Sequence, residues 1–226
     1  MASKIPGYAV HLFTASGALC GFFALMAADQ GKFQHAFFWM IVALIIDTLD
    51  GTLARKIAIR ERIPEINGHY LDLVVDFVNF VFVPAVVFFK MNLVPEPYSY
   101  GCVALILISG CYNFALENDT SDDGFFLGFP AAWHAVVFYL YMFQFPQGVN
   151  GGIVITLFLL HFVPIKFIYL TKHIPWPFLT IPMALGGLAA SCSALYLGPP
   201  LPFWNLIALA IVPLYITGLS ILAAKN

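Results

Sequence analysis

The chain has 226 residues, of which 61% are hydrophobic and only 10% are charged, with a formal net charge of -2 and a mean hydropathy of +0.88. Soluble domains carry about 25% charged residues, so this composition excludes an ordinary soluble protein and indicates an integral membrane protein. The negative net charge and the lack of a large basic patch argue against nucleic acid as a partner.

Eight apolar segments are predicted to be spanning helices, because a span needs about 20 largely apolar residues. They lie near residues 8–28, 33–54, 69–90, 99–117, 125–145, 152–170, 177–197 and 202–223. Turn-forming or charged stretches separate them, as at Pro95-Glu96-Pro97. Since no long polar stretch marks a second domain, the sequence predicts an all-α, polytopic membrane helical bundle that forms a single domain over residues 1–226.

Lysines and arginines predict the orientation of these spans. With the amino terminus in the cytoplasm, only Lys32 and Lys90 fall outside. The residues on the cytoplasmic side are then Lys4, Arg55, Lys56, Arg60, Arg62, Lys166, Lys172 and Lys225. Cytoplasmic loops of membrane proteins are enriched in lysine and arginine. An even number of spans returns the chain to the same side, so both termini are expected in the cytoplasm.

Four aspartates lie in segments that otherwise read as spanning helix. Asp47 and Asp50 end one apolar run, and Asp72 and Asp76 open the next. A carboxylate within a span costs a few kcal/mol, so these side chains need a stabilising partner. The two members of each pair share a helix face, because they are three or four residues apart. Carboxylate oxygens suit hard cations such as Mg²⁺ or Mn²⁺, and two adjacent cations commonly assist displacement at phosphorus.

Small residues and one arginine accompany the carboxylates. Gly51 follows Asp50, while Ala54 and Gly68 extend the two aspartate-bearing faces, so a bulky ligand can approach the backbone there. Arg55 is a natural partner for a phosphate or a carboxylate. Both features also have plainer explanations: small residues let helices pack closely, and a terminal arginine anchors a helix at the membrane interface.

Written together, these positions form one motif. It reads Asp47-x2-Asp50-Gly51-x2-Ala54-Arg55-x12-Gly68-x3-Asp72-x3-Asp76. This motif resembles the signature of the CDP-alcohol phosphatidyltransferase superfamily, whose commonest spacer between the arginine and the next glycine is shorter. His11 and Thr14 resemble the family's first-helix Asn-x-x-Thr region, with His11 in place of the asparagine.

The resemblance implies a reaction in which CDP-diacylglycerol donates its phosphatidyl group to an alcohol and CMP leaves. It implies two divalent cations, Mn²⁺ or Mg²⁺. The resemblance assigns site residues position by position. The metal ligands are Asp47, Asp50, Asp72 and Asp76, and Asp76 is also the proton acceptor for the attacking hydroxyl. The residues that contact the CDP part are Gly51, Ala54, Arg55 and Thr14.

The resemblance also predicts where the protein works and with what. The chain is similar to bacterial members of the family that use choline. We therefore expect a multi-pass protein of the bacterial inner (cytoplasmic) membrane, with its active site facing the cytoplasm. By the same resemblance we expect a homodimer in contact with membrane lipid.

The predicted acceptor alcohol follows from what the chain lacks. A phosphorylated acceptor needs extra arginine or lysine, and outside the signature loop Lys166 is the only basic residue inside a predicted cytoplasmic half-helix. An uncharged or cationic acceptor is therefore favoured, and choline is a quaternary ammonium that aromatic faces can hold. The candidate contacts are Tyr70, Tyr112, Trp133 and Glu117. Because 16% of the chain is aromatic, each of these rings is more often explained by membrane packing.

Two alternatives stay open at this point. A sister enzyme with serine or inositol as acceptor would use the same motif. A protein of another class, a divalent metal transporter, could use the four aspartates as a conduction site. A transporter would need polar residues continuing through other helices, and the later helices carry almost none.

Overall fold

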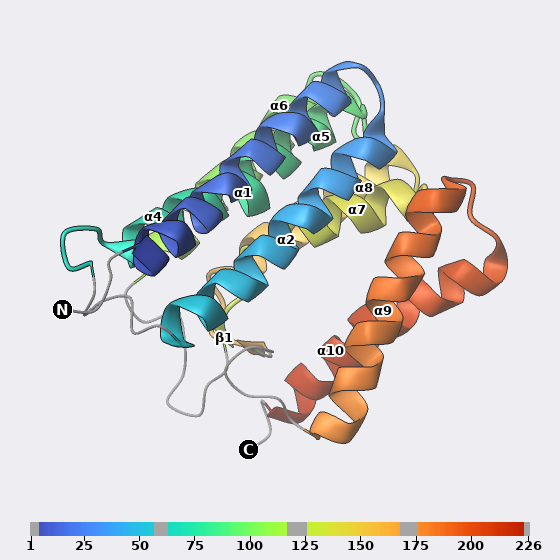
Figure 1. Cartoon of the computed structure of the whole chain (residues 1–226). Coiled ribbons are helices and arrows are strands. Elements are labelled where there is room, and N and C mark those ends of the chain that lie inside the picture. Colours follow the sequence, from blue (N-terminus) through green and yellow to red (C-terminus); the bar gives the residue numbers. More distant parts are fainter. Residues whose placement is uncertain (1–4, 57–62, 117–125, 168–175, 224–226) are drawn as a thin grey trace. The chain divides into compact units, whose positions relative to one another are not determined.

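The structure is a computed structural model that describes residues 5–56, 63–116, 126–167 and 176–223. Six of its helical segments are long and apolar enough to cross a membrane. They are α1 (Ile5–Asp29), α2 (Phe33–Lys56), the continuous segment α4–η1–α5 (Gly68–Phe77, Val78–Phe82 and Val83–Lys90), α6 (Tyr98–Ala115), α9 (Pro177–Leu197) and α10 (Phe203–Ala223) (Figure 1). The predicted all-α, polytopic membrane fold is thereby confirmed, whereas the cytoplasmic position of both termini stays a prediction.

Two predicted spans are wrong in their boundaries. Within the described residues, the segment predicted over 125–145 is α-helical only from Trp133 to Phe143 (α7). The one predicted over 152–170 is α-helical from Gln147 to Leu160 (α8). Two short strands, β1 (Phe126–Leu127) and β2 (Lys166–Phe167), pair antiparallel instead.

Local chemistry explains these breaks. Gly128 adopts a φ of +86°, which side-chain-bearing residues rarely adopt, and Pro130 has no backbone donor to offer a helix. Pro164 likewise follows the end of α8 and cannot continue it. Hydropathy alone does not reveal these helix ends, because the neighbouring non-helical residues are also largely apolar.

The chain divides into two compact units, residues 1–91 and residues 92–226. A single domain over residues 1–226 stays a prediction. In the second unit, α6 packs against α8, and α9 packs against α10. The aspartate motif lies entirely in the first unit.

In the first unit, α1 packs against α2 and along α4, η1 and α5 (Figure 1). Glycines on α1 make this close approach feasible. A Cβ atom on Gly17 would lie 2.8 Å from Cγ1 of Val75, and one on Gly21 would lie 2.7 Å from Oδ1 of Asn79. Small residues at such crossings let helix backbones approach closely inside a membrane.

Candidate metal centre

The four aspartates are positioned by the end of α2 and the start of α4. Asp47 and Asp50 lie within the last three turns of α2, and Asn67 caps α4 five residues before Asp72. The Asn67 side-chain oxygen accepts hydrogen bonds from the backbone N–H groups of His69 (3.1 Å) and Tyr70 (3.4 Å). This cap fixes where the helix begins, and with it the direction in which its carboxylates point.

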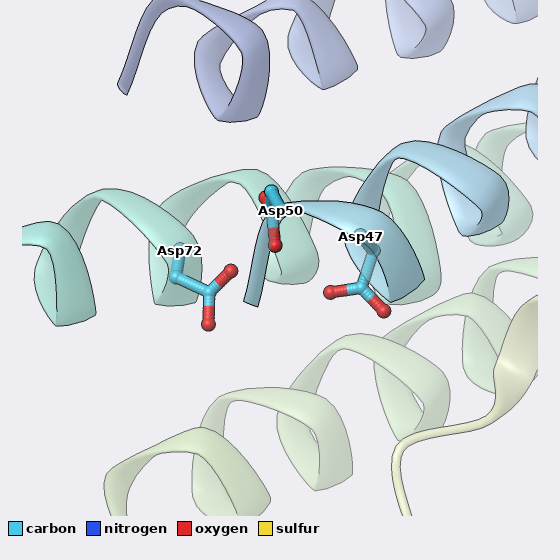
Figure 2. Close-up of side chains that lie close together, drawn as sticks. All are labelled: Asp47, Asp50 and Asp72. Atoms are coloured by element: carbon cyan, nitrogen blue, oxygen red, sulfur yellow. The ribbon is translucent and has the colours of Figure 1, made fainter. Parts of the chain in front are cut away.

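Three carboxylates from the two helices converge. One oxygen from each of Asp47, Asp50 and Asp72 lies within 4.8 Å of the others, and Figure 2 shows the three groups turned toward a common space. The side chain of Asp76 lies within hydrogen-bonding reach of Asp47. The structure thus brings three of the four predicted ligands into one cluster and places the fourth beside it.

The cluster fits a hard divalent cation. Asp50 is only 4% exposed, and the other three aspartates are half-buried. Between described residues, the one ion pair joins Lys90 to Asp29 at 2.7 Å, at the ends of α5 and α1, so no described lysine or arginine neutralises the cluster. Like charges this close repel by several kcal/mol at the effective dielectric of a protein site. A cation with oxygen ligands would remove that cost, and the donor set suits Mg²⁺ or Mn²⁺.

Helix α1 supports the cluster through Thr14. This side chain is buried and lies within hydrogen-bonding reach of Asp50. Its single hydroxyl proton points to the carbonyl of Val10 at 3.3 Å and can turn to the Asp50 carboxylate instead. The sequence placed Thr14 near the CDP part only by resemblance. The structure places it against a predicted metal ligand, so Thr14 can orient the Asp50 carboxylate.

Gly68 has a neighbour that the sequence analysis missed. A Cβ atom on Gly68 would lie 2.9 Å from Cε1 of His11, whose ring is buried. This contact favours helix packing, which the sequence left open for Gly68 beside the approach of a ligand. The Nε2 atom of His11 is buried and has no hydrogen-bond partner among the described residues. Its spacing to Thr14, one helical turn, was the only signal in the sequence.

Gly51, Ala54 and Arg55 lie on the final turns of α2, next to Asp50. Among the described residues, a Cβ atom on Gly51 would meet only the Nη1 atom of Arg55, at 3.4 Å. Arg55 is exposed, and its Nη2 donates to the Thr52 hydroxyl at 3.3 Å. The guanidinium is therefore held along the end of α2, where an anionic ligand of the carboxylate cluster can reach it.

The predicted choline contacts differ in exposure. Tyr70 (66% exposed) and Tyr112 (47% exposed) present open rings, and Tyr112 also contacts Phe162 with ring centroids 5.1 Å apart. Trp133 is completely buried: its ring stacks on His161, and its Nε1 donates to Ser109 at 3.2 Å. It offers no open face to a cation in this structure. Glu117 lies outside the described residues, so the aromatic site stays a prediction.

Comparison with known proteins identifies the family. Residues 9–164 match the CDP-alcohol phosphatidyltransferase family, a range that contains the whole aspartate motif. Three bacterial relatives are phosphatidylcholine synthases. The one from Pseudomonas aeruginosa is 38% identical over 167 residues, which cover 74% of this chain and 70% of the relative. The one from Borreliella burgdorferi is 34% identical and covers 80% and 77%, and the one from Agrobacterium fabrum is 31% identical and covers 95% and 89%.

The family match, the relatives and the geometry agree. Enzymes of this family use divalent cations, and the converging carboxylates of α2 and α4 provide the oxygen ligands that such cations need. The chain belongs to the CDP-alcohol phosphatidyltransferase family.

Proposed function

We propose that this protein transfers the phosphatidyl group of CDP-diacylglycerol to choline and releases CMP. The observation that carries the proposal is the convergence of Asp47, Asp50 and Asp72 from two helices. Similarity to phosphatidylcholine synthases supports the acceptor, and with the Agrobacterium fabrum relative it extends over 95% of the chain. A divalent metal transporter is not favoured, because the chain belongs to a family of transferases.

Asp47, Asp50 and Asp72 would hold two divalent cations, with Asp76 at the edge of the cluster. When bound, such cations neutralise the diphosphate of the donor and stabilise the departing CMP. Thr14 orients Asp50 from the side of α1. The exposed guanidinium of Arg55 binds a phosphate of the CDP part, and Gly51 leaves room for that group beside the backbone.

Asp76 would act as the general base. The hydroxyl oxygen of choline attacks the phosphorus of the phosphatidyl group, the bond from that phosphorus to the CMP oxygen breaks, and the hydroxyl proton passes to the Asp76 carboxylate. Asp76 suits this role because it lies beside Asp47, outside the group of three that lies within 4.8 Å. A base in this position contributes about 10²–10⁴ in rate.

The acceptor would be held through its charge. Tyr70 and Tyr112 expose aromatic faces, which attract a quaternary ammonium group, and Glu117 would supply a counter-charge. Trp133 would contribute only if its buried ring became accessible. A basic pocket for a phosphorylated acceptor is not among the described residues, where Arg55, Lys56 and Lys166 are the cations expected near the cytoplasmic face. Serine or inositol remains the alternative acceptor.

We also propose that the enzyme is a homodimer in the inner membrane of a bacterium, with the metal centre near the cytoplasmic face. The excess of lysine and arginine on the predicted cytoplasmic side supports this orientation. The bacterial origin of the relatives supports the membrane.

The direct test is CMP release by the purified protein in detergent with CDP-diacylglycerol. We expect release to require both choline and Mn²⁺ or Mg²⁺, and to stop when EDTA removes the cation. Choline-independent release at the same rate, or full activity in EDTA, would contradict the proposal.

A further inference from the structure

A buried asparagine links the helix that carries Asp72 and Asp76 to α1. Asn79 is 2% exposed, and its Nδ2 donates to two backbone carbonyls, Gly17 on α1 at 3.0 Å and Val75 on α4 at 3.1 Å. Because both acceptors are carbonyl oxygens, the amide must direct its nitrogen toward them. The amide therefore connects the two helix backbones directly.

Asn79 lies in an irregular turn of its helix. Residues Val78–Phe82 form a π-turn, in which the N–H of Val83 bonds to the carbonyl of Val78. Pro84 explains the irregularity, because it lacks an N–H and its ring would clash with the carbonyl four residues earlier. Single π-turns within α-helices are frequent at functional sites. This one begins two residues after Asp76.

The opposite surface on α1 is shaped to receive the asparagine. A Cβ atom on Gly17 would lie 2.8 Å from Val75, and one on Gly21 would lie 2.7 Å from the side-chain oxygen of Asn79. A side chain on either glycine would displace the side chain of Val75 or Asn79 from its place between the helices. The side-chain oxygen of Asn79 is buried, has no hydrogen-bond partner among the described residues and lies against Gly21.

Helix α1 contacts both helices that carry the carboxylates of the metal centre, α2 and α4. Thr14 contacts Asp50 on α2, and Gly17, one turn later, accepts the hydrogen bond from Asn79 on the α4 side. Asn79 follows Asp76 by three residues and Asp72 by seven, so all three lie near one face of the same helix. The separation between the two carboxylate pairs thus depends on the contact at Gly17.

We propose that Asn79 is a positioning residue for the metal centre, holding α4 against α1 so that Asp72 and Asp76 keep their distance from Asp47 and Asp50. This inference rests on the proposed function, since it takes the carboxylates as metal ligands. The hydrogen bonds that the Asn79 amide donates go to backbone carbonyls and not to the carboxylates.

The test compares Mn²⁺ binding in two asparagine variants. Asn79→Leu keeps the branching and the number of heavy atoms of the side chain and removes its donor. The matched control is Asn150→Leu in the second unit, where Asn150 is 1% exposed and donates to the carbonyls of Leu93 (2.8 Å) and Phe145 (3.4 Å). The protein is purified in detergent, stripped of metal and titrated with Mn²⁺, and the electron paramagnetic resonance signal of free Mn²⁺ reports binding.

We expect Asn79→Leu to lower the apparent Mn²⁺ affinity by at least about tenfold, in the range seen when groups supporting metal ligands are removed. The Mn²⁺ concentration for half-maximal CMP release should rise by the same factor. Asn150→Leu should lose thermal stability but bind Mn²⁺ as the wild type does. Gly17→Ala, which displaces Val75, should also lower the apparent Mn²⁺ affinity. This variant serves as the test if Asn79→Leu does not fold.

The inference would be overturned if the folded Asn79→Leu variant bound Mn²⁺ with wild-type affinity. If Asn79→Leu does not fold, wild-type Mn²⁺ affinity in Gly17→Ala would overturn it. So would an equal loss in Asn150→Leu. Failure of the proposed function has a different signature, because the wild-type protein itself would then bind no Mn²⁺ or release no CMP.

Discussion

Asp50 is the ligand whose replacement should be most damaging. It is the most buried of the four aspartates, at 4% exposed, and its carboxylate lies within 4.8 Å of those of Asp47 and Asp72. Asp50→Asn keeps the shape of the side chain and removes one negative charge from the cluster. A unit charge about 4 Å from a monovalent charge contributes about 4 kcal/mol at an effective dielectric of 20, and more for a divalent cation.

That free energy corresponds to at least about a thousandfold in rate if it is lost from the transition state. We therefore expect Asp50→Asn to insert and fold normally but to release CMP at or below about a thousandth of the wild-type rate. The measurement is choline-dependent CMP release at saturating Mn²⁺, with size-exclusion chromatography to confirm folding.

Asp29→Asn is the matched control for this variant. Asp29 undergoes the same chemical change but is exposed and paired with Lys90 at the far end of α1, where a surface ion pair contributes about 0–1 kcal/mol. It should keep nearly full activity. More than about a tenth of the wild-type rate in Asp50→Asn would refute the metal assignment, since the lost contribution would then be below about 1.4 kcal/mol.

Three further substitutions test other parts of the site. Asp76→Asn should reduce turnover by about 10²–10⁴ and leave CDP-diacylglycerol binding intact, as measured by retention of a labelled donor; loss of binding would make Asp76 chiefly a ligand. Gly68→Ala places a Cβ atom 2.9 Å from His11 and should lower the free energy of unfolding by about 1–3 kcal/mol; thermal unfolding should show recovery in the double variant with His11→Ala, and no recovery would contradict the contact. Tyr112→Ala should raise KM for choline but not for CDP-diacylglycerol in steady-state kinetics, and an unchanged KM for choline would remove Tyr112 from the acceptor site.

The meeting of the carboxylate pairs could be predicted because it depends on local periodicity. Residues three or four apart share a helix face whatever the rest of the chain does, so Asp47 with Asp50, and Asp72 with Asp76, had to point together. A short loop between two antiparallel helices then brings the pairs close. The structure shows this convergence for Asp47, Asp50 and Asp72.

Features that depend on contacts between distant residues could not be predicted. The role of Gly68 became visible only once α1 was placed beside α4, and that of Thr14 only once α1 was placed beside α2. Asn79 was a single polar residue in an apolar run, and sequence alone gives no reason to pair it with Gly17, which is 62 residues away. The true lengths of α7 and α8 were hidden for a simpler reason, since apolar loops and apolar helices have the same composition.

The identity of the acceptor alcohol is tested by a competition experiment. The purified enzyme receives CDP-diacylglycerol, Mn²⁺ and equal concentrations of choline, serine, inositol and glycerol 3-phosphate, and mass spectrometry quantifies the lipid products. A desolvated cation–π contact of about 2 kcal/mol corresponds to about a thirtyfold preference, so phosphatidylcholine should dominate by at least that factor. Equal or greater formation of the serine, inositol or glycerol phosphate product would contradict the choline assignment.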